Sequence, residues 1–270
     1  MKAFLTHFSF EFLNGIRNKN LLLLTYLLPL GFYLMMGFVM VEINPLFLEH
    51  MIPAMVIFGI LSAALLGIPD PLVTARENGV FRSYKINGVP SLTILLMPAL
   101  STIIHLVIVT LIITLSAPLL FDAPPPLNWG WYWLVFLAGS VAVVGLSVLI
   151  GVISKSSRMT VLWSQLVYLP SMMLGGLMIP YSMLPDSVQR FSRILPATLA
   201  MNAFNGLAMG GTSDFSAWGS IATLVSGGAA AFILALFLFS WDSRNTSRRA
   251  HPFLGLVALL PYLLQVILTG

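Results

Sequence analysis

Charged residues divide this chain into long apolar runs separated by short polar gaps. A helix of about 20 apolar residues crosses the roughly 30 Å hydrocarbon core of a bilayer, because each residue adds about 1.5 Å. Runs of that length predict spans near residues 21–41, 51–69, 92–120, 129–153, 161–177 and 218–241. The pattern therefore predicts an all-α polytopic membrane protein with six transmembrane helices.

Residues 253–268 form a further apolar run whose placement the pattern leaves open. As an α-helix this run reaches only about 24 Å, and Pro261 interrupts it. The apolar tail over 252–270 fits a short seventh span, a re-entrant segment or a helix lying on the membrane.

Proline and glycine mark irregular backbone in two spans. Pro29 predicts a kink in the first span. Near the end of the fifth span, Pro170, Gly175, Gly176 and Pro180 lie close together. Non-helical backbone at membrane depth is tolerated only where protein or a cavity surrounds it. We therefore expect the fifth helix to break and turn back in the outer leaflet, with re-entrant outer helices over 178–213 before the sixth span.

An amphipathic helix is predicted ahead of the first span, over residues 3–18. Phe4, Phe8, Phe12 and Ile16 recur every four residues, and polar residues lie largely on the other side. Such a helix suits the membrane interface. Packing of the same helix against the other spans is an equally good interpretation.

The basic residues orient the chain. Of its 13 Lys and Arg, all but Arg190 and Arg193 fall in alternate gaps that share one side of the predicted membrane. Lys and Arg concentrate in cytoplasmic loops, so the N-terminus is predicted to be cytoplasmic, and residues 70–91 form the longest cytoplasmic loop. The eleven residues on this side are Lys2, Arg17, Lys19, Arg76, Arg82, Lys85, Lys155, Arg158, Arg244, Arg248 and Arg249.

Composition narrows the class of protein further. The chain is 58% hydrophobic and 8% charged, with an isoelectric point near 9.6. The biased loops account for the basic balance, so no nucleic-acid partner is expected. Without cysteine there is neither a disulfide framework nor thiolate chemistry. Because every gap is short, residues 1–270 are predicted to be a single transmembrane domain.

The sequence lacks most residue patterns that are typical of catalytic, metal-binding or ion-coupling sites. The six predicted spans carry no acid or base apart from His105, whereas ion-coupled carriers usually need an intramembrane acid or Lys. A hydrogen bond to a neighbouring helix is the favoured role for His105, ahead of a role in transport. No P-loop, catalytic Ser–His or paired-carboxylate constellation, or metal-ligand cluster occurs. The chain is predicted not to be an enzyme and to hold no metal.

The loop after the second span carries the most specific motif: Arg76-Glu77-Asn78-Gly79, basic residues up to Lys85, and then Gly88-Val89-Pro90. Taken alone, it is equally consistent with a solvated, positively charged loop. The chain nevertheless resembles the permease subunits of ABC exporters of the ABC-2 type, in which an Arg-Glu-x-Gly pattern follows the second span. The matching positions are Arg76, Glu77, Gly79, Arg82 and Pro90.

Weaker features in the same order extend this resemblance over residues 3–241. The apolar tail after Pro252 departs from the usual six-span plan of the family. The further matching features are Arg17-Asn18, Pro29-Leu30, Gly37, Gly175-Gly176, Pro180, Leu184-Pro185 and Leu195-Pro196.

The resemblance implies an ATP-driven exporter of the cell inner membrane. Two permease subunits, the second a copy or a related chain, would be embedded among membrane lipids and couple to a separate cytoplasmic ATPase. ATP and Mg would bind that ATPase, and no cofactor would bind this chain. The implied ATPase-coupling residues are Arg76, Glu77, Gly79, Phe81, Arg82 and Tyr84.

The same resemblance places a substrate path at the dimer interface, along the first, second and fifth spans. Its candidate lining carries no charge and suits an apolar or amphipathic cargo, whose identity the sequence leaves open. A non-transporting scaffold subunit and a secondary carrier are the alternative functions. The candidate lining residues are Tyr26, Phe32, Tyr33, Phe58, Gln165, Tyr168, Met172 and Met173.

Overall fold

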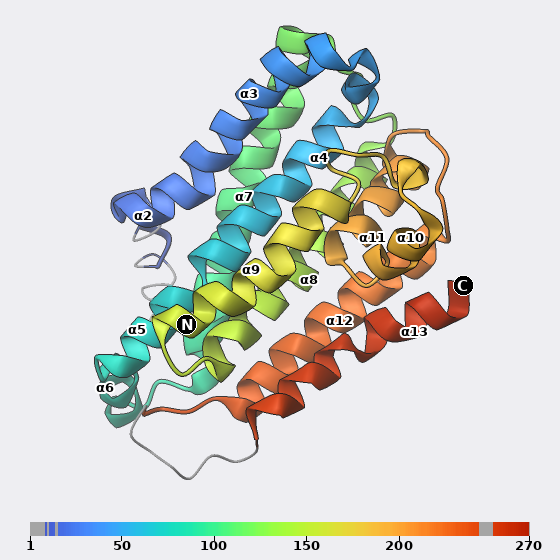
Figure 1. The fold of residues 1–270 in the computed structure, drawn as a ribbon. Helices are drawn as coiled ribbons and strands as arrows, with labels where there is room; N and C mark the ends of the chain where they lie inside the picture. Colours follow the sequence, from blue (N-terminus) through green and yellow to red (C-terminus); the bar gives the residue numbers. More distant parts are fainter. Residues whose placement is uncertain (1–8, 10, 14–15, 243–250, 270) are drawn as a thin grey trace.

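The fold is a bundle of long helices, shown in Figure 1. The structure is a computed structural model and describes residues 9, 11–13, 16–242 and 251–269. All regular structure in these residues is helical. The predicted interface helix over 3–18 lies partly outside the described residues. Its described residues 9, 11–13, 16 and 17 are helical, and Asn18 is the extended N-cap of the helix that begins at Lys19.

The first half of the bundle contains three long helical segments. The first joins α2 to α3, the second joins η2 to α5, and α7 follows the short helix α6. The bounds are α2 Lys19–Leu22, η1 Leu23–Leu27, α3 Leu28–Ile43, η2 Pro45–Phe47, α4 Leu48–Leu61, η3 Ser62–Leu66, α5 Pro69–Glu77, α6 Val80–Ile86 and α7 Ser91–Phe121.

The second half contains three more long helices, several short ones and the tail. The bounds are α8 Trp129–Ile153, α9 Ser157–Leu174, η4 Tyr181–Met183, α10 Asp186–Ser192, α11 Pro196–Ala203, η5 Phe204–Ala208, α12 Ala217–Leu238, η6 Pro252–Leu259 and α13 Leu260–Thr269.

Five helical segments of the described chain are long and apolar enough to cross a bilayer: 19–43, 45–77, 91–121, 129–153 and 217–238. They confirm the prediction of a multi-pass, all-helical membrane protein. The fifth predicted span corresponds to α9, which is not among the five. This helix ends at Leu174, and Gly175 and Gly176 follow it. Gly176 has φ of 82°, a conformation that favours glycine. The helix therefore breaks at the glycine pair, where the sequence predicts a break.

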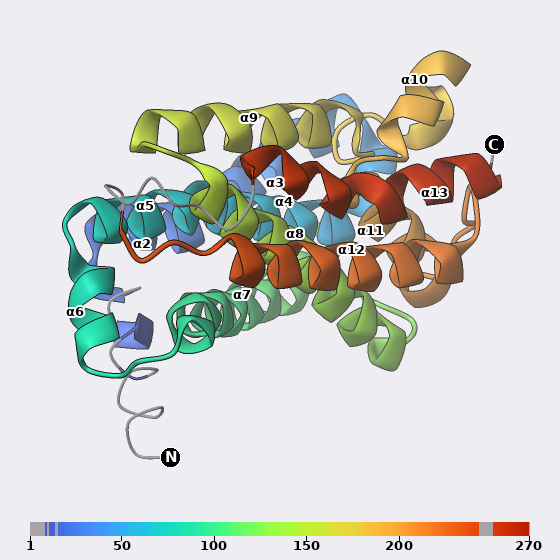
Figure 2. The same cartoon turned by 90° about the horizontal axis from the view of Figure 1, so that it is seen from below.

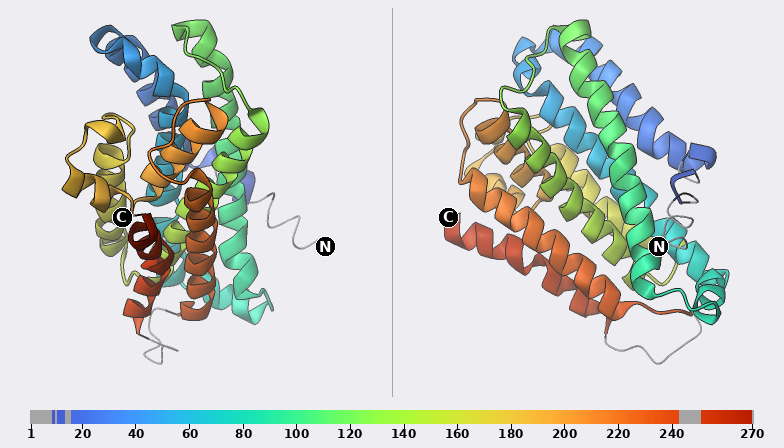
Figure 3. Two further views of the ribbon diagram at one scale, coloured as in Figure 1. Left: turned by 90° about the vertical axis from the view of Figure 1, so that its right-hand side faces the viewer. Right: turned by 180° about the vertical axis from the view of Figure 1, so that it is seen from behind.

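Two spans form the interior, and the others surround them. The most apolar stretch of the second span is 94% buried and that of α8 is 83% buried, against 28% for the first span and 39% for both α7 and α12. Figure 3 shows α7 and α12 on the outside of the bundle. The short helix α11 lies inside, because all eight of its residues are buried. The apolar outer faces are available to lipid or to a partner helix.

Glycines bring α8 and α12 into backbone contact. A Cβ atom added to Gly145 of α8 would lie 2.4 Å from the Gly228 carbonyl oxygen, and one added to Gly228 would lie 2.5 Å from the Val141 carbonyl oxygen. Small residues at such crossings let membrane helices associate by close packing, since lipid supplies no hydrophobic drive between them.

The apolar tail packs along α12 and runs between the two ends of the bundle. Near its start, Gly255 lies by Ile153 at the end of α8. Near its finish, the Thr223 hydroxyl of α12 donates a hydrogen bond to Oε1 of Gln265 at 3.3 Å. The first eight residues of the tail are a 3-10 helix, which rises about 2 Å per residue, so that the apolar run 253–268 reaches roughly 28 Å. This length corrects the estimate for a uniform α-helix.

We predict that Gly228→Ala will destabilise the folded protein by about 1–3 kcal/mol, because the added methyl group overpacks the α8–α12 crossing. Thermal unfolding of the detergent-purified protein measures the effect. Gly31→Ala is the matched control, since a Cβ atom there meets nothing within 4 Å. Equal melting temperatures for the two variants would contradict this account of the crossing.

Candidate coupling surface and translocation path

A helical corner follows the second span at one end of the bundle. The span continues as α5 to Glu77, the chain turns at Asn78 and Gly79, and α6 then lies across the end of the bundle (Figure 2). Gly79 has φ of 75° and Gly88 has φ of 73°, so glycine removes the strain at both ends of α6. The Arg-Glu-x-Gly motif therefore occupies the bend itself.

Arg76 braces the corner from inside. Its side chain is only 5% exposed. Nη1 donates a hydrogen bond to the Val152 carbonyl oxygen at 2.9 Å, and Nη2 donates one to the Ser154 carbonyl oxygen. Both carbonyls belong to the C-terminal end of α8, where unpaired carbonyl groups favour a cation. Arg76 therefore joins the end of α5 to the end of α8.

The helix α6 is tied to the segment that follows α12. The rings of Phe81 and Phe239 lie 5.4 Å apart, and Arg82 forms a 2.5 Å salt bridge to Asp242. The Lys85 ammonium lies 6.0 Å from the centre of the Trp241 ring. The corner thus contacts the ends of α8 and α12 as well as the span that it continues.

The six predicted coupling residues occupy different environments. Arg76 and Phe81 are buried, Gly79 and Tyr84 are half-buried, and Glu77 and Arg82 are exposed. Burial raises the pKa of the Tyr84 phenol, and the charge of Glu11 raises it further. The exposed surface of the corner also includes Ile86, which is 80% exposed and which the sequence reading did not single out.

Three of the predicted path residues form an aromatic cluster across α3, α4 and α9. Phe32 stacks on Phe58 with ring centres 4.2 Å apart, and Phe58 lies 6.4 Å from Tyr168. The three elements that contribute these rings are those expected to line the path. Phe58 and Tyr168 are buried within this single chain.

The remaining α9 residues lie closer to the surface. Gln165 and Met172 are half-buried, and Met173 is 64% exposed. The Oε1 atom of Gln165 is buried without a hydrogen-bond partner among the described residues. An unsatisfied amide oxygen at this depth is costly, and a hydrogen-bond donor from outside the chain would offset that cost.

Tyr26 and Tyr33 turn toward α7 instead of toward the aromatic cluster. The Tyr33 hydroxyl bonds Ser116 Oγ at 2.8 Å. The Tyr26 hydroxyl and the Nδ1 atom of His105 are 2.7 Å apart, while Nε2 lies 3.2 Å from the Phe12 carbonyl oxygen. A neutral imidazole with its proton on Nε2 satisfies both contacts. His105 therefore links neighbouring helices, as expected from the sequence.

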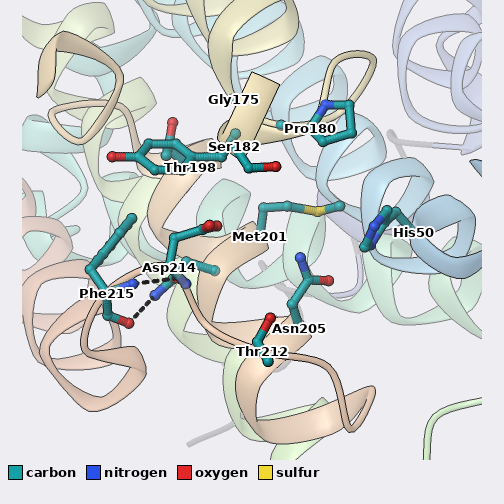
Figure 4. A pocket seen from close by; sticks show the side chains of 13 residues that line it. His50, Gly175, Pro180, Ser182, Thr198, Met201, Asn205, Thr212, Asp214 and Phe215 are labelled. Atoms are coloured by element: carbon teal, nitrogen blue, oxygen red, sulfur yellow. Dashed lines mark hydrogen bonds between the residues drawn. The ribbon is translucent and has the colours of Figure 1, made fainter. Parts of the chain in front are cut away.

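A polar cavity of about 140 Å³ lies at the opposite end of the bundle. It is lined by the start of α4, the turn after α9, η4, α11, η5 and the loop before α12. Figure 4 shows His50 and Asp214 on its two sides, with Met201 between them. The Thr198 hydroxyl is buried here without a hydrogen-bond partner among the described residues. The sequence reading missed this site, although Asn202 and Asn205 interrupt an otherwise apolar stretch and polar residues there are functional candidates.

Asn202 organises one wall of this polar cavity. Its amide nitrogen donates to the Phe215 carbonyl oxygen at 2.9 Å, and its amide oxygen accepts the backbone N–H of Asp214 at 2.8 Å. The Arg193 guanidinium stacks over the Phe215 ring at 5.1 Å and donates to the Tyr181 hydroxyl at 2.7 Å. Within the part of the chain that the structure describes, no group of three or more metal-ligating side chains occurs.

These features define a multi-pass, all-helical membrane protein whose second span continues into a helical corner. The chain belongs to the ABC-2 type transporter family, whose family description matches residues 2–209. It is 23% identical, over 186 residues, to the Bacillus subtilis (strain 168) protein named Putative transport permease YvfS, covering 67% of this chain and 76% of that protein. No solved structure matches the chain.

Family membership confirms the resemblance drawn from the sequence. It makes the chain a transmembrane transport subunit of an ABC transporter, a class that normally works with an ATPase subunit. The matched region ends before α12, so α12 and the apolar tail lie beyond it.

We predict that Arg76→Ala will lower the stability of the folded protein by about 1–3 kcal/mol, because two buried carbonyl groups lose their donor. Thermal unfolding in detergent measures this loss. Lys85→Ala in the same corner is the control, since its exposed side chain is not part of the brace. A melting temperature for Arg76→Ala equal to that of Lys85→Ala would refute the brace.

The polar cavity predicts a pH dependence of stability. Burial raises the pKa of the Asp214 carboxyl, against the opposing charges of Arg193 and His50. Because the folded-state pKa exceeds the unfolded value, the folded state holds the proton more tightly, and stability falls as the pH rises through the folded-state pKa. Asp214→Asn should remove this fall in unfolding scans between pH 4 and 7.

Asp122→Asn is the control for the Asp214 variant. Asp122 is exposed at a left-handed turn, with φ of 57°, a conformation that Asn also tolerates. A pH dependence that disappears equally in both variants would show that the cavity is not its source.

Proposed function

We propose that this chain is the transmembrane subunit of an ATP-driven exporter, pairs with a second permease and docks a separate cytoplasmic ATPase on the α5–α6 corner. The single observation that carries the proposal is the corner itself. It continues one span, is hydrogen-bonded to the end of α8, and contacts the segment after α12 through Phe81 and Arg82.

The corner suits the transmission of movement. Arg76 and Phe81 are buried and position it, while Glu77, Arg82 and Ile86 face outward and supply a charged and apolar surface for a partner. A displacement of α6 by the ATPase would be carried into three helices together, because packed interfaces shift as units. ATP and Mg would bind the ATPase and not this chain.

The translocation path is assigned to the dimer interface formed by α3 and α9. Both helices carry exposed apolar faces, including Phe38 at 66% and Leu166 at 63% exposure. Behind them lie Phe32, Phe58 and Tyr168, with Gln165 as a polar contact. A lining without charge favours an apolar or amphipathic cargo. The partner is a second copy of this chain or a related permease, surrounded by membrane lipids.

The proposal includes a topology. With α9 as the fifth span and α12 as the sixth, α10 and α11 belong to the outer end as a re-entrant pair. The tail then returns along α12 as a short seventh span. The loop charges place the N-terminus and the α5–α6 corner on the cytoplasmic side of the inner membrane.

A scaffold subunit and a secondary carrier are the competing functions. In the described spans, Lys19 and the acids Glu42, Glu49, Asp70 and Glu77 all lie toward the ends. The stretches 21–41, 51–69, 92–120, 129–153, 161–177 and 218–241 carry no acidic side chain or lysine that could bind a coupling ion, which disfavours an ion-coupled carrier. A scaffold would need neither the brace at Arg76 nor the aromatic cluster across three helices.

The test is purification of the tagged chain from its native membrane in mild detergent, with mass spectrometry of stoichiometric partners. We expect a P-loop ATPase to co-purify. Glu77→Ala should lower its recovery about tenfold, equivalent to roughly 1.4 kcal/mol of lost contact. Arg76→Ala is unsuitable as the main variant, because it also weakens the fold.

Glu42→Ala is the matched control, because Glu42 is an exposed acid at the other end of the first span. Its ATPase recovery should equal that of the wild type. Recovery of intact chain without any ATPase would favour the carrier or scaffold functions instead.

A further inference from the structure

A second cavity, distinct from the polar cavity and from the aromatic cluster, lies between α8, α9 and the start of the apolar tail. Its volume is about 560 Å³, within the range of small-molecule sites. Figure 2 shows the tail running between α9 and α12 along this side of the bundle. We refer to it as the tail cavity.

The walls of the tail cavity are apolar and its mouth is basic. Ile153, Trp163, Leu166 and Leu256 are among the wall residues, contributed by α8, α9 and η6. Lys155 and His251 also line it, and both are exposed. Lys155 follows the C-terminal end of α8, and His251 precedes η6, so the two polar groups gather at the same end of the bundle as the α5–α6 corner.

We propose that the tail cavity binds one phospholipid with an anionic headgroup from the cytoplasmic leaflet. An acyl chain lies between α9 and the tail, and the headgroup phosphate meets Lys155. The inference takes from the proposed function only the orientation of the chain, and it assigns to the permease a bound lipid that is separate from its cargo.

The basic mouth of the tail cavity and its place on the cytoplasmic side favour an anionic phospholipid. Basic residues beside a pocket between membrane helices, on the cytoplasmic side, attract anionic headgroups, and each contributes about 1 kcal/mol near the surface. Water would find few polar partners along the apolar walls, so an alkyl chain is the favoured filling. The Trp163 indole also suits the boundary between headgroups and hydrocarbon.

The tail makes the cavity possible. The wall residues Phe253, Leu256 and Leu259 all come from η6, and this segment lies beyond the region matched by the family description. Close packing of the tail on α12 leaves its other side open toward α9, with Leu256 55% exposed. A lipid there would fill the space between the tail and the fifth span.

The test uses the purified permease in detergent, loaded with dioleoyl phosphatidylglycerol or with dioleoyl phosphatidylcholine. Native mass spectrometry measures the lipid that remains bound. We expect one phosphatidylglycerol per chain to be retained in preference to phosphatidylcholine. Lys155→Gln should weaken its apparent affinity about fivefold, the loss of one basic contact. Leu256→Trp should abolish retention, because the indole fills the cavity.

Two matched variants control for general effects. Arg158→Gln removes an exposed cation close to Lys155 that does not line the cavity. Leu264→Trp adds the same indole to an exposed position of the tail outside the cavity. Both variants should retain phosphatidylglycerol as the wild type does. Such retention would show that losses in the test variants come from the cavity and not from misfolding.

Three results would overturn the proposal. They are equal retention of the two lipids, equal loss in the Lys155→Gln and Arg158→Gln variants, and unchanged retention in Leu256→Trp. Co-purification of a phosphate-free amphiphile, lost in Leu256→Trp, would likewise reject a phospholipid and identify the tail cavity as a cargo site. ATPase recovery, measured on the same samples, tests the proposed function independently of the lipid.

Discussion

The guanidinium of Arg76, bound to carbonyl groups at the end of α8, connects the features of this permease that bear on its function. A helix end leaves carbonyls without partners, and in a membrane protein they must be satisfied from within the protein. An arginine from the neighbouring helix meets this need and fixes the direction in which α5 leaves the bundle. The position of α6, and with it the whole coupling corner, depends on that direction.

Around this brace the bundle is held by close contacts rather than by charge. Gly145 and Gly228 bring two backbones together, and Gly227 leaves room for the ring of Tyr262 from the tail. The polar contacts inside are short links between neutral groups, such as Tyr33 with Ser116 and Tyr26 with His105. Charged side chains gather instead at the two ends. This division leaves the middle of the bundle suited to an uncharged path.

The two ends of the bundle differ in chemistry. One end presents the coupling corner and the basic mouth of the tail cavity. The other holds a compact polar cavity lined in part by Asn202 and Phe215, and the Arg193 guanidinium lies over the Phe215 ring. Neither end shows a group of three or more metal-ligating side chains within the described residues.

Most of the architecture could be predicted from the sequence, because a bilayer penalises any charge or unpaired backbone group. The spans are therefore recognisable as long runs of uncharged, apolar residues. The first, third, fourth and sixth spans follow the uncharged runs closely, whereas the second helical segment extends beyond its run to Glu77. The break after Leu174 coincides with Gly175 and Gly176. The charges of residues 76–85 place this segment outside the spans for the same reason, whereas a coupling role for it was predicted only from the family resemblance.

What only the tertiary structure decided is which face each residue presents. Arg76 and Glu77 are neighbours in one motif, yet one is buried against α8 and the other is exposed. Tyr26 and Tyr33 share a span with Phe32 but turn toward α7. The 3-10 conformation at the start of the tail and the cavity beneath the tail depend on contacts between segments distant in sequence. In spans that are apolar all round, periodicity carries little directional information, so packing alone sets these orientations.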